Sequence, residues 1–182
     1  MGYMKPREPE LLDAAFLSAG RALHLAGAFE SKCRYVLRIV NLVSAMQADP
    51  VKDLMDAIAA APADKLLGPT LRDLTNTLPT LPVIVLDKAR LARNFIAHEG
   101  ANMGSVWARP DDILRHVVRL RAAVAGLVPG DNVVSEWVYG LEEPHQSVPR
   151  DLIKAYPAMI DDWVFSHFGQ LLDEPETLVL QP

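Results

Sequence analysis

The sequence has a single cysteine and no apolar run as long as a membrane-spanning helix. Cys33 has no second cysteine with which to form an intrachain disulfide, and its place in an amphipathic run favours a small core residue over a reactive thiol. The most apolar run, residues 36–46, is interrupted by Arg38 and Asn41, which excludes a transmembrane helix. The first ten residues have no apolar segment after their charges, which argues against a secretory signal. We therefore expect a cytoplasmic protein.

An excess of positive charge is also absent, because 18 Lys and Arg face 23 Asp and Glu, for a formal net charge of −5. A protein that coats nucleic acid through charge alone is normally basic. The balance argues against that class but leaves room for an enzyme that draws one phosphate into a local basic pocket. His145 and His167, with Glu142 and Glu143, lack the tight spacing of metal ligands, so we expect neither a metal nor another cofactor.

Helical periodicity is what the sequence does contain. A chain of 182 residues, half of them hydrophobic, can form one domain with a sizeable core. Residues 8–47 carry apolar side chains at steps of three or four, which predicts one long helix or two helices joined near Ser18–Gly20. Further helices are predicted over 51–60, 64–78 (interrupted at Gly68–Pro69), 80–99, 110–127 and 151–172. We expect an all-α bundle of about five main helices over residues 1–130, with a helical C-terminal extension over 131–182 packed on it.

Proline and glycine mark the expected helix ends. The helix after Thr80 has Pro82 in its first turn and Gly100 as a left-handed stop, and its VIVL start at 83–86 could instead be a short strand. The next helix opens at Pro110 and is expected to stop at Pro129–Gly130. Residues 133–140 are then a short helix or an extended piece, Pro157 bends or breaks the last helix, and a loose tail begins near residue 173.

One stretch, LARNFIAHEG at 91–100, places polar groups inside an apolar helix. Arg93 and His98 are five positions apart, which separates them by about 140° around the helix and about 7.5 Å along it. Asn94 and His98 are four apart and share a face. His98 lies in the last turn, where the helix dipole favours an imidazolium. A histidine that can be charged beside a permanently charged guanidinium is suited to binding phosphate.

The spacing of Arg93 and His98 has little specificity alone. With 12 Arg and 5 His in the chain, chance supplies about one pair with four to six residues between them. A second such pair, Arg109 and His116, straddles a loop-to-helix boundary and is the weaker candidate. The Asn after Arg93 and the apolar Phe95 and Ile96 before His98 distinguish the first pair.

RNFIAHEG resembles the signature of the HEPN superfamily, in which an Arg followed by a polar residue precedes a His with four to six residues between them. The resemblance implies a helical bundle with the motif on a late core helix. It also implies a metal-independent endoribonuclease that works as a homodimer with two motifs face to face. His98 would act as general base or acid, Arg93 would stabilise the charge of the transition state, and Asn94 would orient His98 or bind a phosphate oxygen. The products would be a 2′,3′-cyclic phosphate and a 5′-hydroxyl.

The same resemblance implies an RNA substrate, a role as a toxin or phage-defence effector, and an antitoxin or defence protein as a further partner. An alternative is a non-catalytic RNA- or ligand-binding or regulatory helical module. In that case the polar residues of the motif would fix helix register and dimer packing.

Four further charged residues are supporting candidates. Glu30 and Arg34 are four apart, so they form an ordinary intrahelical ion pair, or one of them reaches the Arg93–His98 site. Arg90, just upstream, would widen a basic patch or simply be a solvated charge on the helix surface. Glu99 adjoins His98 in the sequence.

Overall fold

The computed structural model describes residues 8–48, 67–77, 82–103 and 109–173. Within these ranges the protein is all-helical and contains no strand, which confirms the predicted fold class. The helices are α1 (Pro9–Ala48), α3 (Leu67–Thr77), α4 (Val83–Glu99), α5 (Pro110–Glu142) and α6 (Arg150–Asp173). None of these five helices is long and apolar enough to cross a membrane. The helix predicted over 51–60 and the tail from 174 onward lie outside the described residues.

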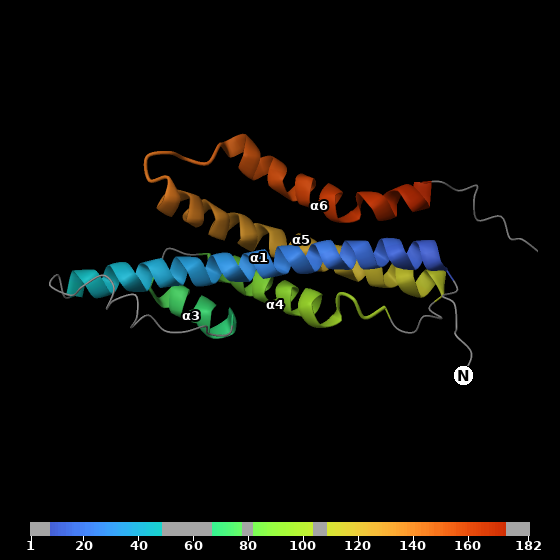
Figure 1. Ribbon diagram of the computed structural model, residues 1–182, viewed down its shortest axis with the longest axis horizontal. Helices are drawn as coiled ribbons and strands as arrows, with labels where there is room; N and C mark the ends of the chain where they lie inside the picture. The colour runs from blue at the N-terminus through green and yellow to red at the C-terminus, as the bar shows by residue number, and fades with distance from the viewer. Residues whose placement is uncertain (1–7, 49–66, 78–81, 104–108, 174–182) are drawn as a thin grey trace, which may run out of the picture.

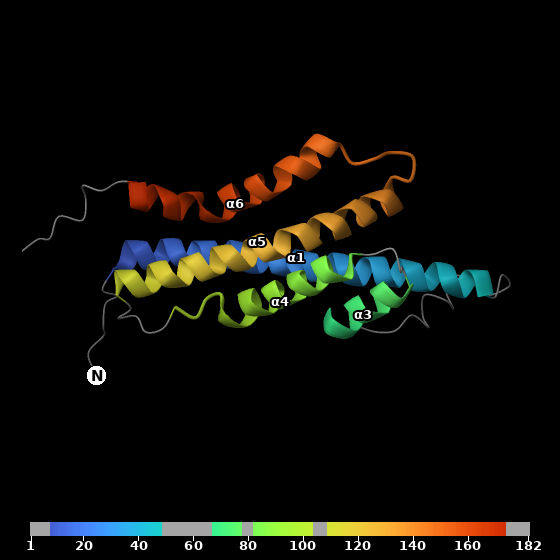
Figure 2. The ribbon, with the colours of Figure 1, turned by 180° about the vertical axis from the view of Figure 1, so that it is seen from behind.

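The helices form three layers, which Figures 1 and 2 show from opposite sides. The long helices α1 and α5 lie side by side and run in the same direction through the middle of the molecule (Figure 1). α6 covers one side of this pair, while α3 and α4 cover the other (Figure 2). Both α4 and α6 run antiparallel to the central pair. The core therefore lies around α1 and α5, and every other helix packs against at least one of them.

The first predicted helix is one unbroken helix of 40 residues. Its expected weak point does not bend the chain into two helices, because Ser18 and Ala19 are buried in the same stripe that continues to Phe29 and Cys33. The described part of the helix predicted over 64–78 is α3, Leu67–Thr77, and residues 64–66 and 78 lie outside the described residues. Gly68 and Pro69 lie within this helix and do not interrupt it. α4 includes residues 83–86 as helix, so the strand alternative is wrong.

Gly100 ends α4, but the prediction of a left-handed stop is wrong. Its φ of −55° and ψ of −35° are ordinary right-handed helical values. A Cβ at this position would lie only 2.4 Å from the carbonyl oxygen of Ile96, which also accepts the Gly100 N–H at 3.1 Å. The glycine is thus required by close backbone approach and not by a positive φ.

The predicted stop at Pro129–Gly130 is also wrong, because α5 continues through both residues to Glu142 and includes 133–140 as helix. Pro129 cannot donate to the carbonyl four residues before it, but this position is exposed and water can reach that carbonyl. Gly130 packs so tightly on α4 that a Cβ there would lie 2.3 Å from the Ala89 Cβ. Burial of Leu127 and Val134 on either side stabilises the continuous helix. The boundary expected between 1–130 and 131–182 therefore falls inside one helix.

α6 agrees with its predicted bounds to within one residue at each end and also contains a proline. Pro157 has no N–H for the carbonyl of Ile153, which instead accepts a hydrogen bond from Asn132 Nδ2 on α5 at 3.3 Å. The helix thus continues through the proline with its carbonyl satisfied from a neighbouring helix. Phe165 and Phe168 of this helix are buried, whereas Trp163 is 40% exposed.

Candidate functional site

Arg93 lies at the seam between α1 and α4, where Glu30 holds it. Its Nη2 donates to Glu30 Oε2, and its Nη1 donates to Asn94 Oδ1 at 3.2 Å. The other carboxylate oxygen of Glu30 accepts from Arg34 Nη2 at 2.6 Å. Glu30 is therefore both the partner of Arg34 within α1 and the residue that reaches Arg93, so the two interpretations of this pair hold together.

Because the Glu30–Arg93 pair is partly buried, its electrostatic attraction is stronger than that of a surface ion pair. The Glu30 side chain is 12% exposed and that of Arg93 22% exposed, so solvent screens their attraction only in part. A guanidinium has five N–H groups, and the two contacts to Glu30 and Asn94 use two of them. The arrangement fixes Arg93 while leaving donors for a further anionic oxygen.

His98 points away from this pair. It is exposed on the last turn of α4, and no side chain in the part of the chain that the structure describes hydrogen-bonds to it. Arg93 faces α1, so the two residues lie on different sides of α4, as their spacing requires. Asn94 contacts Arg93 in this structure. One chain alone thus presents Arg93 and His98 on separate surfaces of the same helix.

Two supporting candidates lie away from Arg93. Arg90 donates through Nε and Nη2 to Asp87 Oδ1 at 2.9 and 2.8 Å, which makes it half of an intrahelical ion pair. Glu99 accepts from Arg119 Nη2 on α5 at 3.3 Å, and both side chains are more than half exposed. The structure therefore brings Glu30 and Arg34 to Arg93 and does not bring Arg90 or Glu99 there.

The end of α4 beside His98 is fixed by a stack of three side chains that the sequence did not reveal. His116, which is 8% exposed, lies with its Nε2 2.9 Å from the Gly100 carbonyl oxygen. Its ring stacks on Phe95 with centroids 6.3 Å apart and an interplanar angle of 29°. The guanidinium of Arg119 lies 5.0 Å from the centroid of the same Phe95 ring. His116 is thus a buried packing residue that holds Gly100, and it does not pair with Arg109.

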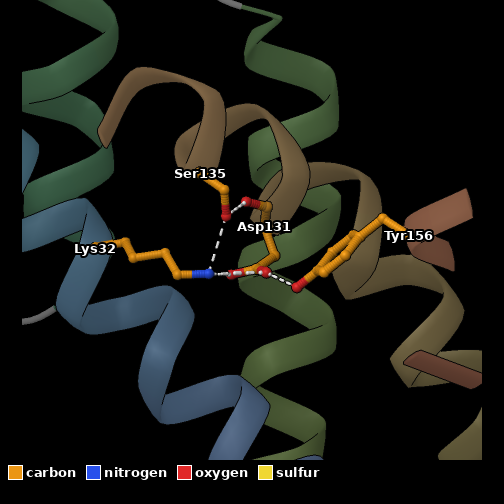
Figure 3. Close-up of polar contacts among 4 residues, drawn as sticks. All are labelled: Lys32, Asp131, Ser135 and Tyr156. Carbon is orange, nitrogen blue, oxygen red and sulfur yellow. Dashed lines mark hydrogen bonds and ion pairs between the residues drawn. The ribbon is translucent and has the colours of Figure 1, made fainter. Parts of the chain in front are cut away.

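A second polar cluster joins three helices and involves none of the predicted site residues (Figure 3). Asp131 on α5 is fully buried, and its carboxylate accepts from Lys32 Nζ on α1 at 2.9 and 3.1 Å. The Tyr156 hydroxyl on α6 donates to the same carboxylate. Ser135 accepts from Lys32 at 2.9 Å and donates to the Asp131 carbonyl oxygen at 2.7 Å. Every member of the cluster has a partner, which is what a buried carboxylate requires.

Cys33 lies on α1 near both polar groups, and its surroundings keep the thiol protonated. Burial, followed by the negative charges of Asp131 and Glu30, raises the pKa of the thiol from 9.0 to about 12. Burial likewise raises the pKa of Tyr156, helped by its hydrogen bond to Asp131. This supports the interpretation of Cys33 as a core residue, because a reactive cysteine needs accessible thiolate.

We expect Cys33 in the folded protein to react with a disulfide reagent at pH 8 no faster than the protein unfolds. The unfolded thiol loses its proton above about pH 9, whereas the folded one keeps it to about pH 12. Deprotonation of Cys33 therefore does not lower the free energy of unfolding below pH 9. As the pH rises from 9 to 12, the unfolded thiol loses its proton first, and the free energy of unfolding falls. A Cys33→Ala variant should show a shallower fall over that window in urea titrations. Equal labelling rates in native and denatured protein would contradict this account.

Charge is unevenly divided among the helices. α1 has four basic and three acidic side chains and α4 has three and two, whereas α5 has three and five and α6 has two and four. The two helices that hold Glu30, Arg34 and Arg93 are therefore net positive in a chain whose overall charge is negative. α1 and α4 together therefore carry more positive charge than α5 and α6.

Comparison with protein-family models, curated proteins and solved structures found no match to this chain. Within the described residues, no group of three or more His, Cys, Asp or Glu side chains could hold a metal ion. The function must therefore be argued from the geometry of the site itself.

Proposed function

We propose that this protein is a metal-independent endoribonuclease of the HEPN type. The observation that carries the proposal is the Glu30–Arg93 pair, which holds a guanidinium in a fixed place on the same helix as a solvent-accessible His98. The net positive charge of α1 and α4 supports phosphate binding at this place. The all-helical fold agrees with the resemblance that the motif suggests.

In this proposal His98 transfers protons and Arg93 binds charge. His98 takes the proton from an RNA 2′-OH, or gives one to the 5′-oxygen that leaves. The 2′-oxygen attacks the adjacent phosphorus, the bond to the 5′-oxygen breaks, and the products end in a 2′,3′-cyclic phosphate and a 5′-hydroxyl. Arg93 stabilises the additional negative charge on the phosphate oxygens in the transition state.

A homodimer would complete the site. A single His98 cannot serve as general base and general acid at once, so each chain would supply one histidine. Two copies of α4 related by a twofold axis would place one His98 opposite the other. The outer face of α4 that includes His98 also exposes Ile84 and Leu91, at 73% and 56%, which favours burial against a second copy.

A non-catalytic RNA- or ligand-binding module is the second candidate, and one observation favours it. The carboxylate of Glu30 already neutralises part of the charge of Arg93. An arginine so engaged could hold α4 against α1 without contributing to any reaction. A role as a toxin or defence effector, with a cognate antitoxin or defence protein, belongs to the catalytic proposal alone.

The test is RNA cleavage in EDTA by the purified chain. Wild-type protein should cut a single-stranded RNA and leave intact the same RNA with 2′-deoxy nucleotides, because the 2′-OH is the nucleophile. A His145→Ala variant, which removes an exposed histidine on the loop before α6, should cut like wild type. Binding of both RNAs without cleavage of either would favour the non-catalytic module.

The anchoring role of Glu30 gives a separate prediction on stability. Glu30→Gln removes the charge shared by Arg34 and Arg93, and we expect the free energy of unfolding to fall by about 1–3 kcal/mol. Urea titration followed by circular dichroism measures this change. Glu136→Gln, which alters an exposed glutamate on α5, is the control and should change stability very little. Equal stability of the two variants would show that Glu30 does not anchor Arg93.

A further inference from the structure

Arg119 of α5 lies beside the end of α4 that carries His98. Its Nη2 donates to Glu99, the neighbour of His98, at 3.3 Å. Its guanidinium lies 5.0 Å from the centroid of Phe95, one turn before His98 on the same helix. Phe95 is in turn stacked on the buried His116, whose contact with Gly100 fixes this corner of the fold. The guanidinium therefore rests on a rigid platform although 62% of the Arg119 side chain is exposed.

This placement leaves Arg119 available to an anion. Apart from the single long contact to Glu99, its N–H groups make no hydrogen bond that involves described residues. The partner Glu99 is itself 56% exposed, so their attraction is well screened and costs little to give up. A guanidinium positioned over an aromatic ring still has its N–H donors, which can bind phosphate oxygens.

Arg93 and Arg119 lie on opposite sides of His98 around α4. Arg93 is directed toward α1 and Glu30, whereas Arg119 approaches from α5 against Phe95 and Glu99. An RNA strand whose reacting phosphate meets His98 would place a neighbouring phosphate within reach of the α4–α5 side.

We propose that Arg119, held on Phe95, forms a phosphate-binding subsite for the RNA strand next to His98. The inference rests on the proposed function for the identity of the ligand, but its test does not require cleavage. The probe is a short fluorescein-labelled single-stranded RNA with 2′-O-methyl nucleotides, which cannot be cut through its 2′ oxygen. Its binding is measured by fluorescence anisotropy over a series of salt concentrations.

Loss of one phosphate contact has a defined signature. Arg119→Ala should weaken binding about fivefold to tenfold and should reduce the slope of log Kd against log salt by about 0.7, the value for one phosphate on a single strand. Phe95→Leu, which removes the aromatic platform, should give a smaller change in the same direction. Arg115→Ala is the matched control, since Arg115 lies one turn earlier on α5, is 72% exposed and is paired with Asp112.

The outcomes separate the two proposals. If Arg119→Ala alters the salt slope but wild-type protein never cuts unmodified RNA, the result supports the subsite and contradicts the catalytic function. If wild-type protein cuts RNA and Arg119→Ala leaves the slope of log Kd against log salt unchanged, the result contradicts the subsite alone. Equal effects of Arg115→Ala and Arg119→Ala, or no binding of the probe by wild-type protein, would overturn the subsite.

Discussion

Replacing His98 with alanine is expected to slow RNA cleavage by about 10²–10⁴-fold, the usual contribution of a general acid or base. Histidine is the side chain used most often for this role. His98 is exposed and makes no hydrogen bond to another described side chain, so its removal should leave the fold intact. The initial rate of cleavage in EDTA, compared with that of His145→Ala, measures the effect.

The stability of the His98→Ala variant is the control that gives this result its meaning. Substitutions at exposed sites usually change the free energy of unfolding by less than about 0.5 kcal/mol. A variant that is inactive and as stable as wild type assigns the loss to chemistry. Full activity in the variant would contradict the assigned role of His98, and unfolding of the variant would indicate a structural role for this residue.

Replacing Lys32 with methionine is expected to lower the free energy of unfolding by about 3–5 kcal/mol, as when one partner of a buried ion pair is removed. Asp131 is fully buried and would keep hydrogen bonds from Tyr156 but lose the only positive charge that contacts it among the described residues. Methionine preserves most of the length of the Lys32 side chain, so the effect reports the charge. Urea titration measures the change.

Two comparisons make the Lys32 prediction specific. Lys154→Met alters an exposed lysine on α6 and should have little effect on stability. Lys32→Met combined with Asp131→Leu should recover part of the loss, because no uncompensated charge then remains in the core. A loss below about 1 kcal/mol for Lys32→Met alone, as at a surface ion pair, would contradict the account of this cluster.

Periodicity is sufficient to predict the five described helices, since their apolar stripes face a common core. It failed at Pro129 and Gly100, where the decisive contacts come from other residues. Whether a proline ends a helix depends on what is buried on both sides of it, and Gly130 is held against Ala89 of α4. The conformation of Gly100 depends on its approach to Ile96 and on His116 from α5.

The wrong helix end at Pro129–Gly130 is also why the sequence does not predict the second polar cluster, that of Asp131. The sequence predicts a helix end at Pro129–Gly130 and therefore places Asp131 at the start of a separate extension, whereas Asp131 lies in a buried turn of α5. Its partners Lys32 and Tyr156 lie on α1 and α6. Lys32 is 99 residues away in the sequence, and no local pattern predicts a contact over that separation. Glu30 differs from Asp131 because the sequence does single it out. It lies four residues before Arg34 among apolar neighbours, and in the structure it reaches Arg93.

The central claim is that this chain cuts RNA through the 2′-oxygen without a metal ion, and analysis of the cut ends tests it most directly. RNA incubated with wild-type protein in EDTA should yield fragments that end in 2′,3′-cyclic phosphate and begin with 5′-hydroxyl, and His98→Ala should yield none. Fragments with 3′-hydroxyl and 5′-phosphate ends, or intact RNA after incubation with folded wild-type protein, would contradict it.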